Sequence, residues 1–181
     1  MKIKLLVVIS LMVVMSAAMV APVMAAETGN TTITGNPTAY VALTINSATV
    51  AMTLIPPGVN SDTSNHLDAA ANCPSAIKAK DAMTNGKPSA GFMVNVTTAD
   101  GTYLTDTLGA AMGISGTAIG VFTTTPISPL TAVDQTLYTG SGAGPSQELA
   151  LSFNQAVAYS DKILPTGYSY RIPVTFTITA T

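Results

Sequence analysis

Two stretches near the end of the chain alternate most clearly between apolar and polar residues. Within residues 148–157 the apolar Leu149, Leu151 and Phe153 share one face. Within residues 168–180 Val174, Phe176 and Ile178 alternate with threonines. A period of two is typical of a half-buried strand, because successive side chains of a strand point to opposite faces of the sheet. Pro173 lies inside the second stretch and cannot donate to a ladder, so it predicts an edge position or a bulge.

Shorter stretches of the same kind precede these two, separated by turns that contain glycine or proline. The strands predicted in this way cover residues 40–45, 49–55, 91–97, 108–114, 118–124 and 135–138, with a further strand beginning at Tyr103. The turns and loops predicted between them include Pro56-Pro57-Gly58, Asn85-Gly86, Asp100-Gly101, Pro165-Thr166-Gly167, and residues 125–132 and 139–145. Many short strands with such turns predict an all-β fold, an antiparallel β-sandwich.

Residues 59–90 have the least regular pattern. Residues 67–83 are rich in alanine and compatible with a helix, but Pro74 interrupts them. Within residues 75–81 the two lysines alternate with Ile77 and other small or apolar residues. This alternation favours a strand over residues 75–81.

The N-terminus has a different pattern. Lys2 and Lys4 precede an almost unbroken apolar run over residues 5–20, and small residues follow up to Ala26. This order is typical of a secretory signal peptide, with cleavage expected after Ala25 or Ala26. The alternative is an uncleaved membrane anchor, but the run is shorter than the roughly 20 apolar residues of a spanning helix.

The chain is therefore expected to consist of a signal peptide (1–26), a leader (27–37) and a β-sandwich domain (38–181). The leader is mostly Thr, Gly and Asn with one Ile. It is interpreted either as a flexible tail or as a strand donated to a neighbouring molecule. No second apolar stretch of similar length occurs, so we expect no transmembrane segment in the mature form.

Charge is sparse along the whole chain. Charged residues make up 9% of the sequence, against roughly a quarter in typical soluble domains. After removal of the signal peptide, five basic residues stand against nine acidic ones, a net charge of −4. A mildly acidic chain without a basic cluster argues against nucleic acid as a partner. Low charge with abundant Thr and Ser is instead typical of exported structural proteins.

Three groups of residues carry a family resemblance. They are a Thr-rich first strand leading to Leu54-Ile55-Pro56-Pro57-Gly58, the loop Gly140-Ser141-Gly142-Ala143-Gly144 followed by Leu151-Ser152-Phe153-Asn154-Gln155-Ala156-Val157, and Gly167-Tyr168 leading into Val174-Thr175-Phe176-Thr177. Together they resemble the immunoglobulin-like β-sandwich domains that methanogenic archaea and some bacteria export to their surfaces. The resemblance spans most of the mature chain and implies that fold and a surface location. It brings no catalytic residues, and the tryptophan common in the middle strand of such domains, near Ala76 here, is missing.

Candidate catalytic or metal-binding residues are few. His66 is the only histidine, and Asp62 and Asp68 near it in sequence could form a small metal or acid/base cluster; a polar loop between strands is the favoured interpretation. Asp100 and Asp106 could supply the carboxylate pair of a glycoside hydrolase, but the hairpin turn between them accounts for both.

Other catalytic motifs do not support an enzyme. No Gly-x-Ser-x-Gly elbow occurs, and Cys73 with His66 lacks a supporting motif. Residues 140–144 lack the Gly-x-Gly-x-x-Gly spacing of a phosphate-binding loop. We therefore expect no catalytic, metal or cofactor-binding residues, no cofactor, and no enzymatic activity.

Three residues are candidates for covalent modification. Asn30 and Asn95 each begin an Asn-x-Thr sequence, the acceptor for N-glycosylation in exported proteins. Cys73 is the only cysteine, so it is expected either to pair between chains or to remain a buried thiol, the latter being favoured.

These observations favour a secreted cell-surface structural protein. A subunit of an extracellular filament, sheath or layer could assemble by β-strand addition, with residues 27–35 as the donated strand. The partners would then be other copies of the chain or other cell-surface proteins. The alternative is a monomeric binding module or adhesin that recognises carbohydrate or another surface component.

Overall fold

The computed structural model describes residues 35–84 and 86–181, of which Pro37–Thr181 form one compact unit. The described residues are all-β, and every strand pair is antiparallel. The strands are β1 (Val41–Ile45), β2 (Gly58–Asp62), β3 (His66–Ala71), β4 (Ser75–Asp81), β5 (Phe92–Thr97), β6 (Tyr103–Ala111), β7 (Gly113–Gly116), β8 (Phe122–Thr124), β9 (Gln135–Gly140), β10 (Gly144–Val157), β11 (Tyr168–Arg171) and β12 (Val174–Ala180). Within this part of the chain no helix has the length and hydropathy needed to cross a membrane.

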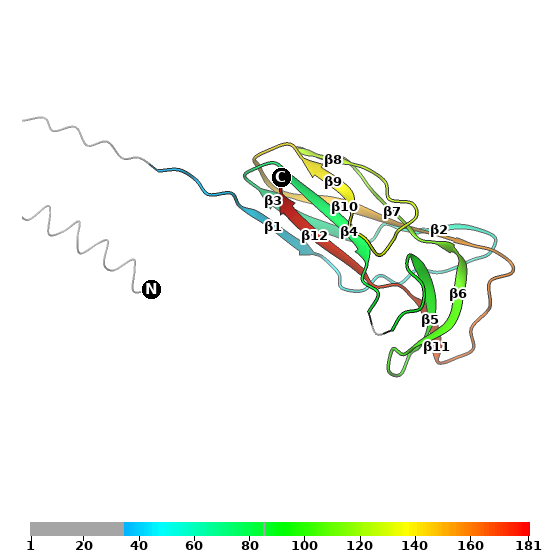
Figure 1. The fold of residues 1–181 in the computed structure, drawn as a ribbon. Coiled ribbons are helices and arrows are strands. Elements are labelled where there is room, and N and C mark those ends of the chain that lie inside the picture. Colours follow the sequence, from blue (N-terminus) through cyan, green and yellow to red (C-terminus); the bar gives the residue numbers. More distant parts are fainter. Residues whose placement is uncertain (1–34, 85) are drawn as a thin grey trace, which may run out of the picture. The chain divides into compact units, whose positions relative to one another are not determined.

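The strands form three sheets (Figure 1). One sheet has the order β1-β3-β10-β2, with β7 also pairing with β10, and a second has the order β12-β4-β9-β8. A third, β11-β5-β6, lies at one end of the domain. Short connections after β3 and after β9 carry the chain from the first sheet to the second and back.

The core lies between the first two sheets. Alternate residues of their central strands point inward and are almost fully buried, as the period of two requires. They include Leu67 and Ala69 of β3, Ile77 and Ala79 of β4, Leu137 of β9, and Leu149 and Leu151 of β10. The opposite faces of β3, β4 and the first part of β10 carry polar or small side chains, which accounts for their alternating sequence; in β9 a bulge leaves both Leu137 and Tyr138 buried.

Residues 125–130 close one long side of the two layers. The N–H of Thr125 donates to the carbonyl of Leu137 in β9 (2.8 Å), while Ile127 exchanges two backbone hydrogen bonds with Ile114 of β7 (2.9 and 2.8 Å). The predicted loop over residues 125–132 is confirmed as lying outside the strands. It is nevertheless part of the core, since Ile127 is almost fully buried.

Several predicted strands are confirmed. The strand over residues 75–81 is β4, and the helix considered for residues 67–83 does not form. Strands also occur at or within the predicted residues 40–45 and 91–97, and the turn at Asp100-Gly101 precedes β6. The single strand predicted over residues 168–180 is divided at Pro173 into β11 and β12; both are edge strands, as the proline predicts.

Other boundaries were predicted wrongly. The expected strands over residues 108–114 and 118–124 are divided differently among β6, β7 and β8, and the expected loop over residues 139–145 shrinks to a turn between β9 and β10. Both β2 and β3 were missed. Their Asn-, Ala- and Asp-containing sequences have low strand propensity, and pairing with β10 overrides it.

The strand predicted over residues 49–55 is also wrong. Val50, Met52 and Leu54 are half-buried and alternate with exposed residues, as predicted, but the segment joins no ladder. A period of two reports which side chains face the core. It does not report whether a neighbouring backbone is present to pair with.

Asp81 and Lys87 form a buried ion pair where the chain leaves β4 for β5. Neither side chain has exposed surface. The Asp81 carboxylate also accepts hydrogen bonds from the N–H groups of Gly91 (2.7 Å) and Met83 (3.1 Å), and the Lys87 ammonium also donates to the carbonyl of Ser89. The pair thus fixes the segment that links the second sheet to the third.

We expect the Asp81→Ala substitution to lower the free energy of unfolding by about 3–5 kcal/mol, because it leaves the Lys87 ammonium buried without a counter-charge. Urea denaturation measures the change. The control is Asp134→Ala, which breaks the partly exposed pair with Lys80 (3.0 Å) and should change the free energy of unfolding by about 0–1 kcal/mol. Equal losses in the two variants would contradict a special role for the buried pair.

Candidate functional site

The side of the domain opposite residues 125–130 is open. There β12 pairs only with β4, and β1 pairs only with β3. No backbone hydrogen bond joins β1 to β12 in the described part of the chain. The outward-directed backbone groups of both strands therefore have no partner strand, although β1 and β12 run beside each other (Figure 1).

Incomplete burial of core-facing side chains marks this open side. Phe176 and Ile178 of β12 lie opposite Ala79 and Ile77 of β4 in the ladder, so all four point toward the core. The two side chains on β4 have no exposed surface, whereas those on β12 are only half-buried. The edge strand thus presents apolar surface that nothing in the described domain covers.

The segment after β1 has the same property. Val50, Met52 and Leu54 face the core but remain half-buried. None of the backbone N–H or C=O groups of residues 50–54 forms a hydrogen bond with another described residue. Unpaired backbone of this kind must be satisfied by water or by a partner.

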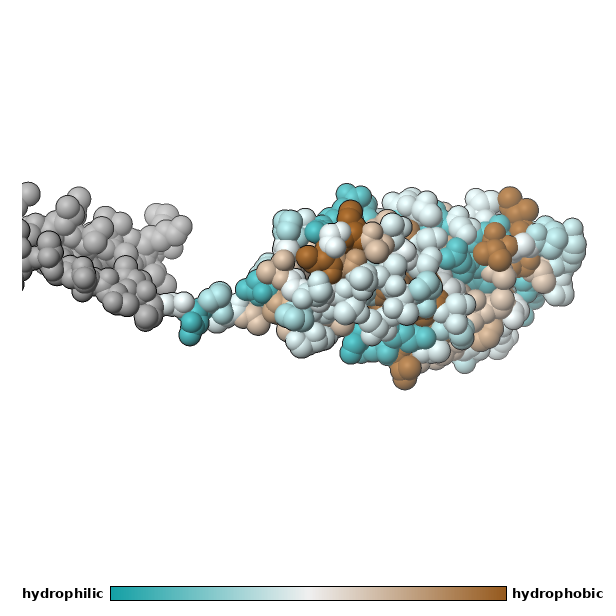
Figure 2. Space-filling view, turned by 90° about the horizontal axis from the view of Figure 1, so that it is seen from above, coloured by the Kyte–Doolittle hydropathy of each residue, from teal (hydrophilic) through white to brown (hydrophobic). Residues whose placement is uncertain are grey.

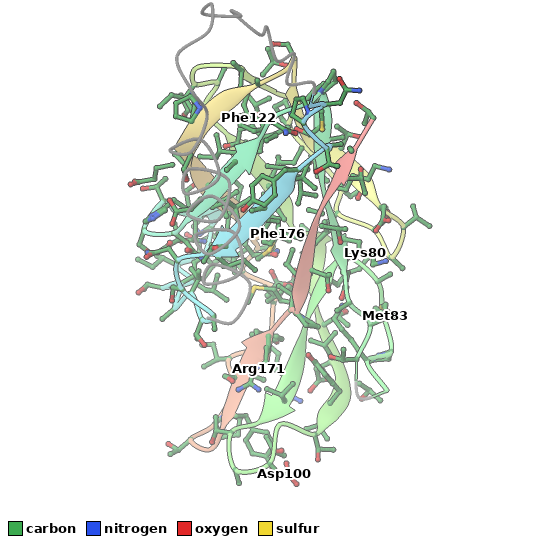
Figure 3. The ribbon with its side chains drawn as sticks, turned by 90° about the vertical axis from the view of Figure 1, so that its left-hand side faces the viewer. Lys80, Met83, Asp100, Phe122, Arg171 and Phe176 are labelled. Carbon is green, nitrogen blue, oxygen red and sulfur yellow. The ribbon has the colours of Figure 1, made fainter. Side chains whose placement is uncertain are left out.

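A groove of about 500 Å³ lies between these two walls. One wall is formed by residues 45–52 and the other by residues 171–176, and the floor comes from Met93, Met112 and Phe153. Phe153 packs edge-to-face against Phe176 with ring centroids 6.5 Å apart, which fixes the position of the aromatic wall. Figure 3 shows Phe176 on the side where β1 and β12 run together, with Arg171 farther along toward the third sheet.

The lining determines what this groove can do. Most side chains in it are apolar and no described acid lies in it; its polar members are Ser47, Thr49, Asn65 and Arg171. No described histidine or carboxylate lines it that could activate the hydroxyl of Ser47 or Thr49. It offers apolar surface beside unpaired strand edges, the combination that recognises an extended peptide segment.

The cluster considered around His66 forms with a different set of acids. Asp62 instead accepts hydrogen bonds from the N–H (2.9 Å) and hydroxyl (2.6 Å) of Ser64. Asp68 does lie near His66, and Glu148 of β10 joins them. Sequence reasoning missed Glu148 because it is 80 positions or more from both partners, and only the pairing of β3 with β10 brings it close.

Asp100 and Asp106 are held by different partners. The side chain of Thr97 donates to Asp100 and lowers the pKa of that carboxyl; the Lys162 ammonium, 2.7 Å from Asp106, lowers the pKa of the second. A general acid in glycoside hydrolysis needs a raised pKa. The direction of both shifts therefore gives no support for that chemistry.

Of the two predicted glycosylation acceptors, Asn95 lies among the described residues. Asn30 lies outside the described residues. Asn95 lies on β5 with 4% of its surface exposed, and its Nδ2 is 3.5 Å from the Asp106 carboxylate. The structure places this amide inside the fold rather than in the surface loop that a glycan acceptor needs.

Cys73 lies in the turn between β3 and β4 and is partly exposed. The same turn holds the ends of the two open-edge strands, because the N–H of Asn72 donates to the carbonyl of Tyr40 and the N–H of Thr181 to that of Pro74. The thiol is therefore not fully buried, and its pairing between chains stays a prediction.

No protein-family model matches this chain, and no curated protein and no solved structure matches it either. The function is therefore inferred from the geometry of the described residues.

We expect the Lys162→Met substitution to raise the pKa of Asp106 toward the ordinary value of 3.8, because it removes the donor that stabilises the carboxylate. A carboxyl whose pKa is depressed in the folded state contributes stability that is fully present above its unfolded-state pKa. This stability is lost as the pH falls through the folded-state pKa. The variant lacks this contribution, so it should lose less stability on acidification. Carboxyl NMR titration measures the shift. Asp100, held by Thr97, is the internal control, and its pKa should not move.

Proposed function

We propose that this chain is exported by its N-terminal signal peptide and that its domain, an immunoglobulin-like β-sandwich, is a structural protein of the cell surface. In this proposal it is a subunit of an extracellular filament, sheath or layer. The subunits associate by β-strand addition, in which an extended segment of one copy pairs with the open edge of the next.

The open side of the domain is the observation that carries this proposal. A free strand edge is an aggregation hazard that monomeric proteins usually cover, charge or shorten. Here β12 is seven residues long and ends in the run Thr175 to Ala180 without a charged residue. An edge left uncharged beside an apolar groove is suited to a specific partner strand.

The proposed occupant is residues 27–35 of a second copy. Nine residues in extended form span roughly 30 Å, enough to pair along the whole of a seven-residue strand, roughly 23 Å long. Ile33 is the one large apolar residue in this segment. Its side chain would enter the groove, where full burial of such a side chain contributes about 1.5–3 kcal/mol.

The composition of the surface supports close packing between subunits. Figure 2 shows a face of mostly pale, weakly polar residues with apolar side chains in only a few places. Lysine and arginine make up 7 residues of the full chain and acids 9. Few charges would have to be desolvated when such surfaces come together, so the penalty for contact is small.

The first test compares the mature chain starting at Glu27 with a variant starting at Thr38. We expect the longer form to make high-mass, regular assemblies by light scattering and electron microscopy, and the shorter form to stay monomeric. The shorter form keeps the hydrogen bond from Asn72 to the carbonyl of Thr38 and so retains the β1 edge. Two forms that both stay monomeric at high concentration would instead favour the monomeric binding module.

A second test separates strand insertion from nonspecific stickiness of the leader. Adjacent residues of a strand point to opposite faces, so Ile33 and Thr34 cannot both face the groove. We expect Ile33→Asp to abolish assembly and Thr34→Asp to leave it intact. Equal loss in both variants would show that added charge, rather than burial of Ile33, prevents assembly.

A further inference from the structure

A second group of side chains lies on the outer face of the first sheet, away from the groove. Leu67 and Ala69 of β3 point into the core, so His66 and Asp68 point outward on the same face. In the pairing of β3 with β10, Glu148 lies directly opposite Asp68, and Ala150 opposite His66. The register therefore brings one imidazole and two carboxylates together from residues far apart in sequence.

The two carboxylates are unusual among the acids of the described residues. Two like charges directly across an antiparallel pair are unfavourable. Every described aspartate other than Asp68 has a hydrogen-bond donor or a lysine as partner: Ser64 for Asp62, Lys87 for Asp81, Thr97 for Asp100, Lys162 for Asp106, Lys80 for Asp134, and the N–H groups of Gly109 and Ala158 for Asp161. In the same part of the chain, His66 is the only oppositely charged partner of the Asp68 and Glu148 side chains.

The nitrogen and oxygen atoms of these three side chains lie close enough together to share one metal ion. His66 Nδ1 is 3.6 Å from Glu148 Oε1, and His66 Nε2 is 3.9 Å from Asp68 Oδ2. One donor atom from each residue lies within 4.8 Å of the other two. An ion binds only one of the two ring nitrogens, so the partly exposed carboxylate that faces the other nitrogen would have to turn toward it to complete a site with bonds of about 2.0–2.2 Å.

We propose that His66, Asp68 and Glu148 bind a divalent transition-metal ion such as Zn²⁺. The imidazole nitrogen favours these metals over Ca²⁺ and Mg²⁺, which prefer oxygen ligands in larger number. The ion would offset the facing carboxylate charges and tie β3 to β10 through side chains. Three protein ligands leave at least one coordination position for water, as in open zinc sites. The proposal does not depend on the function proposed for the groove.

The test is a titration of the metal-free mature chain with Zn²⁺ by calorimetry, and with Co²⁺ by visible absorption, which reports the ligand set. We expect one ion per chain, and more than about tenfold weaker binding in each of His66→Gln and Glu148→Gln. Even outer-shell partners of metal sites contribute about 10–100-fold in affinity, so loss of a direct ligand should exceed the lower figure. Thermal unfolding without metal checks that each variant is folded.

Two controls address other sources of binding. Cys73→Ser removes the only thiol and Asp134→Asn removes a partly exposed carboxylate elsewhere, and both should bind Zn²⁺ like the unmodified chain. Unchanged Zn²⁺ binding in His66→Gln would overturn the proposed site. Binding of Ca²⁺ as tight as that of Zn²⁺ would overturn the assignment of the imidazole as a ligand.

Discussion

The pairing of β10 with three other strands is the interaction on which the rest of this structure depends. Its first part pairs with β3, and its second part lies between β7 and β2. Inward-facing residues of the same strand form the middle of the core, Phe153 contributes to the floor of the groove, and outward-facing Glu148 completes the cluster with His66. A shift of one residue in this register would exchange the two faces and remove the core, the groove floor and the cluster together.

The strand edges are covered on one long side of the layered domain and open on the other. On one side residues 125–130 cross between the sheets, hydrogen-bond to both, and place Ile127 in the core. On the other side β1 and β12 do not pair with each other, and Phe176 and Ile178 remain half-buried. The open side is where we propose that a partner strand binds.

The low charge of the chain gives the few ionic contacts clear roles. The Asp81–Lys87 pair is fully buried and fixes a chain crossing, where removal of one partner would leave an uncompensated charge. The pairs Lys80–Asp134 and Lys162–Asp106 lie at the surface, where solvent screening keeps their contribution small. His66 lies between two carboxylates that have no lysine or arginine within ion-pair distance among the described residues, which is why this cluster, and not the others, is a candidate for a metal ion.

The sequence by itself determined the all-β class, most of the strands in the second half of the chain, the strand over residues 75–81, and the edge position implied by Pro173. These features depend on alternation and on the missing N–H of proline, which are local properties. Only the tertiary structure decided that residues 49–55 lack a ladder, that Ala-rich β3 is a central strand, and that Glu148 joins His66 and Asp68. Strand pairing joins residues far apart in the chain, so alternation shows which way a side chain faces but not which backbone lies beside it.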